Sequence, residues 1–122
     1  SSPRVWVTRL LGTAGCLDHF ETLACGDEVA AAKPDPAGYA LAMARLAVPA
    51  ADALAFEDSP HGVTAATAAG LRCVAIPNRF TDPSRYGHAD LLLSSAADRT
   101  LDQVLSSVDQ GNRTYRKVRR LY

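Results

Sequence analysis

The residues of this sequence best suited to chemistry are two adjacent carboxylates, Glu57 and Asp58, and one lysine, Lys33, that precedes them in the chain. The acids directly follow an apolar stretch, residues 53–56, that is typical of a short buried strand. Carboxylates at the carboxyl end of a strand in an open α/β sheet lie where such folds bind ligands. Two hard oxygen donors also suit Mg²⁺, which takes one or two carboxylates and keeps several waters. The pattern therefore predicts a phosphate and metal site.

The lysine stands in the segment Lys33-Pro34-Asp35-Pro36. A residue before proline is held in extended geometry, and Asp35 is the natural cap of a helix that begins at Pro36. The Lys33 ammonium is then expected near a helix N-terminus, where anions are favoured. Taken alone, Lys33 would be an ordinary surface lysine. Its pairing with the downstream acids favours a role in phosphate binding.

Three further residues are candidates for binding. Ser1 and Ser2 stand at the start of a predicted helix and could hold a phosphate, although capping of that helix by Ser2 is an equal alternative. His61 follows the acids and could bind a substrate, with a solvated histidine as the alternative. For the acidic pair the alternative is a solvated turn. Ser59 as helix cap and Gly62 as a point of close backbone approach leave the carboxylates free for chemistry.

The predicted elements that must position these residues alternate between strands and helices. Helices are expected over residues 2–17, 36–46, 60–69 and 100–108, and strands over residues 22–25, 53–56, 72–76 and 90–94, with a loop at residues 79–89. Short apolar strands between helices predict an α/β fold, with a Rossmann-like parallel sheet and helices on both faces.

Composition narrows the class of protein. The 122 residues have the length of one domain, and their formal net charge is zero, which gives no support to nucleic acid or a membrane as partner. No apolar run approaches the roughly 18 residues of a membrane span. Cys16, Cys25 and Cys73 are odd in number without metal-ligand spacing, so reduced thiols in a cytoplasmic protein are expected. We expect a domain over residues 1–110 and a disordered basic tail over residues 111–122.

Three segments together carry a resemblance to a known family. They are Lys33-Pro34-Asp35-Pro36, the motif Glu57-Asp58-Ser59-Pro60-His61-Gly62, and residues 68–77, Ala-Ala-Gly-Leu-Arg-Cys-Val-Ala-Ile-Pro. From residue 1 to about residue 108 the sequence resembles the haloacid dehalogenase superfamily, in particular its β-phosphoglucomutase-like phosphatase branch. The resemblance implies an Mg²⁺-dependent phosphate-monoester hydrolase of the sugar-phosphate type.

Roles follow from the resemblance by position. Lys33 would steady the phosphoryl group and the attacking carboxylate, and would count as the catalytic residue of this chain. Glu57 and Asp58 would hold Mg²⁺, directly or through water. Ser1 and Ser2 resemble the end of the family's phosphate-binding serine motif. The expected small-molecule partner is a phosphorylated metabolite.

The sequence also departs from the family. The family's nucleophile and general acid are two aspartates in an Asp-x-Asp motif that ends its first strand, ahead of a cap domain, and this sequence has no such motif. We therefore expect the C-terminal part of a longer phosphatase, inactive alone, whose missing N-terminal segment is its partner. Since the family's first strand lies in the middle of the sheet, the expected fold is incomplete, with an unpaired gap that lowers stability and invites association.

Other functions remain open at this point. A phosphomutase would return the phosphoryl group to another hydroxyl of the sugar. A non-catalytic protein could keep half the site for binding or assembly. A receiver-like signalling domain also combines acids with a Lys-Pro pair, but there the acids precede the lysine, the reverse of the order found here. Asp27 and Asp35 lie in the wrong loops to replace the missing nucleophile.

Overall fold

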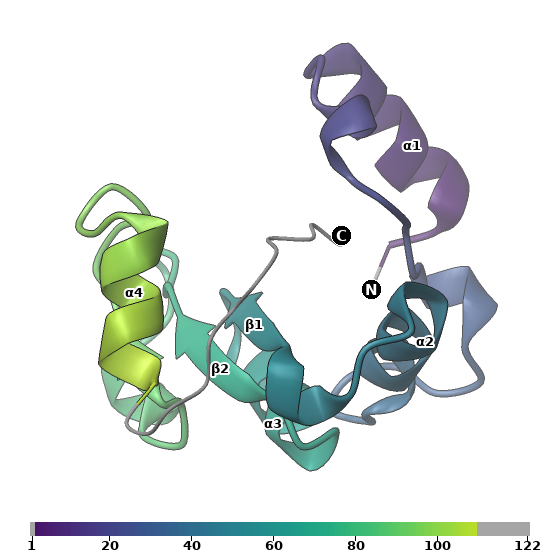
Figure 1. Ribbon diagram of the computed structural model, residues 1–122. Coiled ribbons are helices and arrows are strands. Elements are labelled where there is room, and N and C mark those ends of the chain that lie inside the picture. Colours follow the sequence, from purple (N-terminus) through teal and green to yellow (C-terminus); the bar gives the residue numbers. More distant parts are fainter. Residues whose placement is uncertain (1, 110–122) are drawn as a thin grey trace.

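A computed structural model of the chain describes residues 2–109. Within them, the centre of the fold is a parallel sheet of three strands, and Figure 1 shows its place among the helices. The strands are β1 (Leu54–Glu57), β2 (Arg72–Ala75) and β3 (Leu91–Leu92), in the order β1-β2-β3. In the register, Glu57 lies opposite Ala75, and Ala75 opposite Leu92. The predicted α/β fold with a parallel sheet is confirmed.

The helices are α1 (Arg4–Thr13), α2 (Ala37–Leu46), α3 (Pro60–Ala68) and α4 (Leu101–Val108). Of these, α3 packs on one face of the sheet and α4 on the other. The side chains of neighbouring residues in a strand point to opposite faces of the sheet, so β2 contributes side chains to two hydrophobic clusters. Cys73 packs with Val63 of α3, while Val74 packs with Val104 of α4. The middle strand is therefore buried on both sides.

A separate apolar cluster lies under α1. Val7 and Leu11 of this helix pack against Leu23 and Cys25, which the sequence analysis assigned to a strand over residues 22–25. That prediction is wrong for a full strand, since the segment holds a single bridge residue, Thr22, and no strand within residues 2–109 covers it. A strand needs a neighbour for its main-chain hydrogen bonds. Here the Leu23 carbonyl instead accepts from the side chains of Arg4 and Arg45.

The start of α1 also differs from expectation. Capping of this helix was one of the two alternatives for Ser2, but Pro3 takes the N-cap position. Instead, Asp27 Oδ1 accepts from the Arg4 main-chain N–H at 2.9 Å, a bond between residues far apart in the sequence. The helix ends at Thr13 rather than near residue 17, and Gly15 then takes a positive φ of 69°. Gly15 therefore turns the chain out of the helix.

One carboxylate ties α1 to α2. Glu28, in the short 3₁₀ helix η2 (Gly26–Glu28), accepts from Arg4 Nη2 and from Arg45 Nη2, each at 2.9 Å from Oε1. Hydrogen bonding by Arg45, by the Cys25 main-chain N–H and by Arg4 lowers the pKa of Glu28 to about 2. The charged carboxylate is therefore the form that joins the two helices.

Some expectations lie outside the described residues. Ser1 and the basic tail over residues 111–122 belong to this group. Cys16, Cys25 and Cys73 are free thiols, as expected. Within residues 2–109, no helix has the length and apolar character needed to cross a membrane.

Candidate functional site

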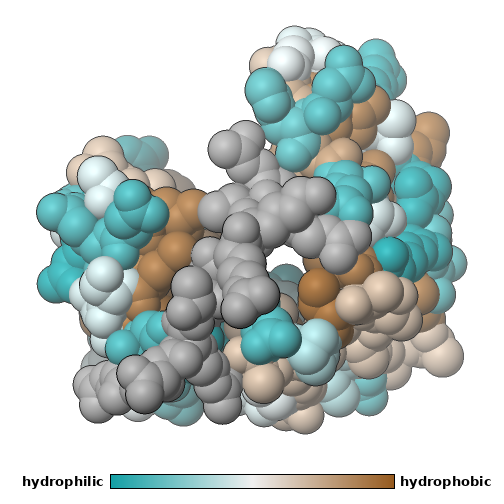
Figure 2. Space-filling view, in the orientation of Figure 1, coloured by the Kyte–Doolittle hydropathy of each residue, from teal (hydrophilic) through white to brown (hydrophobic). Residues whose placement is uncertain are grey.

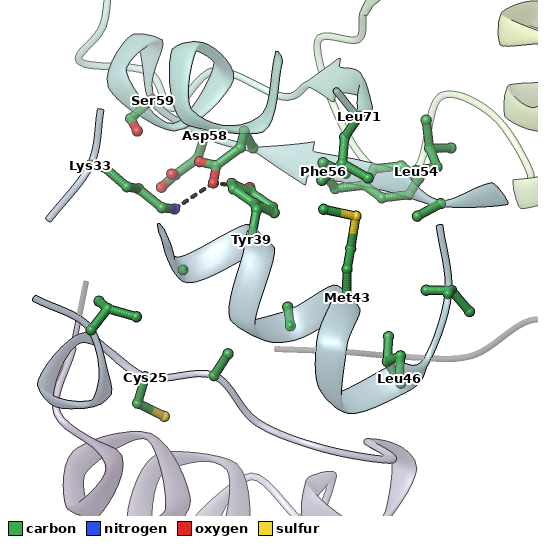
Figure 3. Close-up of a pocket in the computed structure, with 18 of the residues that line it drawn as sticks. Cys25, Lys33, Tyr39, Met43, Leu46, Leu54, Phe56, Asp58, Ser59 and Leu71 are labelled. Atoms are coloured by element: carbon green, nitrogen blue, oxygen red, sulfur yellow. Dashed lines mark hydrogen bonds and ion pairs between the residues drawn. The ribbon is translucent and has the colours of Figure 1, made fainter. Parts of the chain in front are cut away.

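The structure brings Lys33 and Glu57 together at the carboxyl end of β1. In Figure 3, the labelled side chains of Lys33, Tyr39 and Asp58 gather around this point. The Lys33 ammonium donates to Glu57 Oε1 and forms an ion pair with it. The side chain of Glu57 is only 4% exposed, whereas that of Lys33 is 36% exposed. A lysine has three N–H donors, so Lys33 keeps donor capacity toward solvent after it has bound Glu57.

Tyr39 makes a second contact to the same carboxylate oxygen, which no local pattern of the sequence indicated. Its hydroxyl, carried on the first turn of α2, donates to Glu57 Oε1, and the Lys33 ammonium lies 5.6 Å from its ring centroid. Burial first, and then Glu57, raise the pKa of Tyr39 above its usual value. The hydroxyl therefore stays protonated and acts as a donor. The helical spacing of residues 36–46 puts Tyr39 on one face with Met43 and Leu46, which accounts for its ring but gives no signal for its hydroxyl.

Gly62 lies against the other oxygen of Glu57. A β-carbon built on residue 62 would stand 1.8 Å from Glu57 Oε2. Ser59 Oγ accepts from the Gly62 N–H at 3.1 Å and so caps α3, as the sequence analysis predicted. The predicted close approach at Gly62 is thus confirmed, and the group that approaches is the carboxylate of Glu57.

Asp58 differs from its neighbour in both burial and contacts. It is exposed, and its carboxylate makes no hydrogen bond or ion pair with any residue between 2 and 109. Its main-chain carbonyl accepts from the Tyr86 hydroxyl at 2.6 Å. The two adjacent acids are therefore one buried and paired carboxylate and one open carboxylate.

This donor set fits a hard, well-hydrated cation. Residues 2–109 hold no group of three or more His, Cys, Asp or Glu side chains of the kind that encloses a metal. Mg²⁺ does not require such an enclosure, because it binds through one or two carboxylates together with waters and substrate phosphate. Asp58 has free oxygens for such an ion, while Glu57 Oε1 already accepts from two donors.

The remaining predicted residues lie apart from this cluster or outside the described chain. Ser2 is exposed and lines the same groove as Lys33 and Asp58. His61 is exposed on the first turn of α3, and its side chain has no hydrogen-bond partner within residues 2–109. Ser1 is not among the described residues.

The groove beside these residues has a volume of about 1160 Å³. The site residues lie at its polar end, and apolar side chains line the rest: Met43, Leu46, Leu54, Phe56, Leu101 and Leu105. Figure 2 shows apolar surface on the flank of α4 that faces this hollow. Within residues 2–109, β1 pairs with a strand on one side only, so its other edge borders the groove.

Comparison with known proteins places this arrangement in a family. The model of the haloacid dehalogenase-like hydrolases matches residues 1–76, which include Lys33, Glu57 and Asp58. The YhcW protein of Bacillus subtilis is 38% identical over 92% of this chain and 51% of its own length. Validoxylamine A 7'-phosphate phosphatase of Streptomyces hygroscopicus subsp. limoneus is 37% identical, over 80% of this chain and 46% of its own.

A solved structure supports the same assignment. A variant of CbbY from Rhodobacter sphaeroides, in complex with xylulose-1,5-bisphosphate, matches with a TM-score of 0.64 and 43% identity. The match covers 68% of this chain and 37% of that one. The chain thus spans about half, or less, of the length of the relatives it matches. With the family model matching more than half of its residues, the chain belongs to the haloacid dehalogenase-like hydrolases.

Proposed function

We propose that this chain carries the lysine and acidic half of the site of an Mg²⁺-dependent phosphate-monoester hydrolase. The observation that supports this proposal most directly is the Lys33–Glu57 ion pair. It joins the Lys-Pro loop to the acidic motif at the carboxyl end of β1. The open carboxylate of Asp58 follows directly on this pair. Lysine and carboxylate together suit a phosphate held by a cation and a metal ion.

Each residue has a distinct part in the proposed site. Lys33 holds a phosphoryl oxygen through donors that Glu57 leaves free, and Glu57 fixes where the ammonium stands. Asp58, with Glu57 directly or through water, would hold Mg²⁺. The metal would supply positive charge against the phosphoryl oxygens.

The nucleophile of the reaction is proposed to lie outside these residues. Asp27 Oδ1 accepts from the Arg4 main-chain N–H and Asp35 Oδ1 from the Ala37 main-chain N–H, so both carboxylates are engaged at the starts of helices. In the whole protein, an aspartate of an Asp-x-Asp motif would attack the phosphorus and form an aspartyl-phosphate. The second aspartate would protonate the leaving oxygen and then activate water. Relatives whose names specify phosphorylated sugar-like molecules favour a small phosphorylated metabolite as substrate.

The test uses the complete open reading frame that encodes this chain. Hydrolysis of a panel of sugar phosphates, polyol phosphates and phosphoglycolate is measured with Mg²⁺ and with EDTA, for the wild type, K33A and D58N. We expect Mg²⁺-dependent release of phosphate, reduced by about 10²-fold or more in each variant. Full activity of K33A and D58N would overturn the proposal. Turnover by the 122-residue chain alone would show that its nucleophile lies within these residues.

A further inference from the structure

Three consecutive main-chain carbonyls fix the strand-to-helix turn that carries Asp58. The Glu57 carbonyl accepts from the Ile76 N–H at 2.7 Å, as part of the sheet, and the Ser59 carbonyl accepts from the Val63 N–H at 3.0 Å, as part of α3. Between them, the Asp58 carbonyl accepts from the Tyr86 hydroxyl at 2.6 Å. Only this middle bond comes from a side chain.

Tyr86 is held firmly enough to fix that carbonyl. It is 2% exposed and ends the short 3₁₀ helix η4 (Pro83–Tyr86), and its ring packs in the core between the sheet and α3. Asp82 caps η4 by accepting from the Ser84 N–H at 2.9 Å. A buried hydroxyl needs a partner, and so does a carbonyl at such a turn, so the bond between them satisfies both groups.

The carboxylate of Asp58 depends on this backbone for its direction. Because it contacts no polar partner within residues 2–109, only the backbone and the staggered wells of its side chain set where it points. We propose that Tyr86 is a positioning residue for Asp58, whose hydroxyl holds the turn so that the carboxylate faces a divalent cation. The inference rests on the proposed function and adds the loop between β2 and β3 to the site.

The test measures Mn²⁺ binding to the protein encoded by the complete open reading frame, by electron paramagnetic resonance, with Mg²⁺ as competitor. Y86F keeps the buried ring and removes only the hydroxyl, and we expect its Mn²⁺ dissociation constant to rise about tenfold. T67V is the matched control, because it removes the side-chain hydrogen bonds that the Thr67 hydroxyl donates to the main-chain carbonyls of Val63 and Thr64, elsewhere on α3. Its dissociation constant is expected to equal that of the wild type, even where its melting temperature falls as far as that of Y86F.

The two hypotheses fail in different ways. Wild-type affinity in Y86F, together with lost binding in D58N, would overturn the positioning role and leave the proposed metal site standing. Equal affinity in the wild type and D58N would overturn both. If T67V weakens Mn²⁺ binding as much as Y86F does, the effect of Y86F reflects a general loss of stability. That result would overturn the positioning role of Tyr86.

A second measurement covers the case in which Y86F does not fold. Wild-type chain labelled with ¹³C at the tyrosine ζ position is titrated with Mg²⁺, and Tyr86 is assigned by replacing the other tyrosines with phenylalanine one at a time. We expect the Tyr86 resonance to shift with Mg²⁺ in the wild type and to stay in place in D58N. A Tyr86 resonance whose chemical shift does not change when Mg²⁺ is added would overturn the inference.

Discussion

The carboxylate of Glu57 occupies the space that a side chain at position 62 would fill. A β-carbon on Gly62 would lie 1.8 Å from Oε2 and 2.7 Å from Oε1 of Glu57. The carboxylate reaches this place from β1, and the glycine belongs to the first turn of α3. On its other side the carboxylate is held by Lys33 and Tyr39. Gly62 is therefore a condition for the ion pair rather than a flexible point of the helix.

Substitution of Gly62 by alanine is expected to displace Glu57. We expect G62A to lower the free energy of unfolding by about 1–3 kcal/mol, because the added methyl group overpacks a held carboxylate. Urea unfolding followed by circular dichroism measures the loss. G38A in α2 is the matched control: its β-carbon meets nothing within 4 Å, so it should be neutral or stabilise by about 0.5–1 kcal/mol. Equal stability of the two variants would contradict the prediction.

Removing either partner of the Lys33–Glu57 pair is expected to have unequal effects. K33M leaves a carboxylate that is 4% exposed without its cation and should destabilise by about 2–3 kcal/mol. E57Q leaves an ammonium that is 36% exposed, and the amide still accepts from Tyr39, so about 1 kcal/mol is expected. Urea unfolding compares the two variants. When E57Q is already present, adding K33M should lower the free energy of unfolding little further. If K33M destabilises the E57Q variant as much as it destabilises the wild type, Lys33 and Glu57 are not energetically coupled.

The Tyr39 hydroxyl is expected to stabilise Glu57 separately from the tyrosine ring. Y39F removes one donor from the buried carboxylate and should lower the free energy of unfolding by about 1–2 kcal/mol. Y39L removes in addition the ring near the Lys33 ammonium and should be less stable still. Thermal unfolding of both variants measures the two contributions. An unchanged Y39F would show that the hydroxyl contributes nothing.

Glu28 predicts a pH dependence of stability. Its pKa is about 2 in the folded chain against an ordinary value of 4.5, so the folded state favours the charged form. Its contribution is complete above pH 4.5 and is lost as the pH falls toward 2. The melting temperature of the wild type should therefore exceed that of E28Q at about pH 6. The two melting temperatures should become equal as the pH approaches about 2. A constant difference over this range would contradict the assignment.

Within residues 2–109, no strand pairs with one edge of β1, and this edge predicts self-association. Phe56 is 47% exposed on this strand, and an uncovered strand edge with apolar side chains is a template for pairing between chains. We expect sedimentation velocity to show association of the wild-type chain that rises with concentration. F56K should reduce it, because a charged side chain on an edge strand opposes pairing. V5K, on the exposed face of α1, is a control for loss of apolar surface, and an equal effect of both would argue against the strand edge.

Local sequence signals predicted much of the fold. Residues 60–69 and 100–108 show caps and apolar periodicity, and they form α3 and α4 with Ser59 and Thr100 as the caps. The wrong predictions concern residues whose partners are distant in the chain. Residues 22–25 have the composition of a strand but no strand neighbour within residues 2–109, and Asp27 took the capping place expected for Ser2.

The sequence by itself determined which residues could bind a phosphate or a metal ion and which local structures carry those residues. Lys33 before proline, and two acids between a strand and a helix, follow from residue types and spacing alone. Only the tertiary structure decided that Glu57 is buried and paired while Asp58 is open, and that Tyr39 and Tyr86 hold them. The physical reason is the distance along the chain over which each interaction acts. Caps and periodicity act within a few residues, whereas burial and these hydrogen bonds join segments that meet only when the sheet and its helices pack.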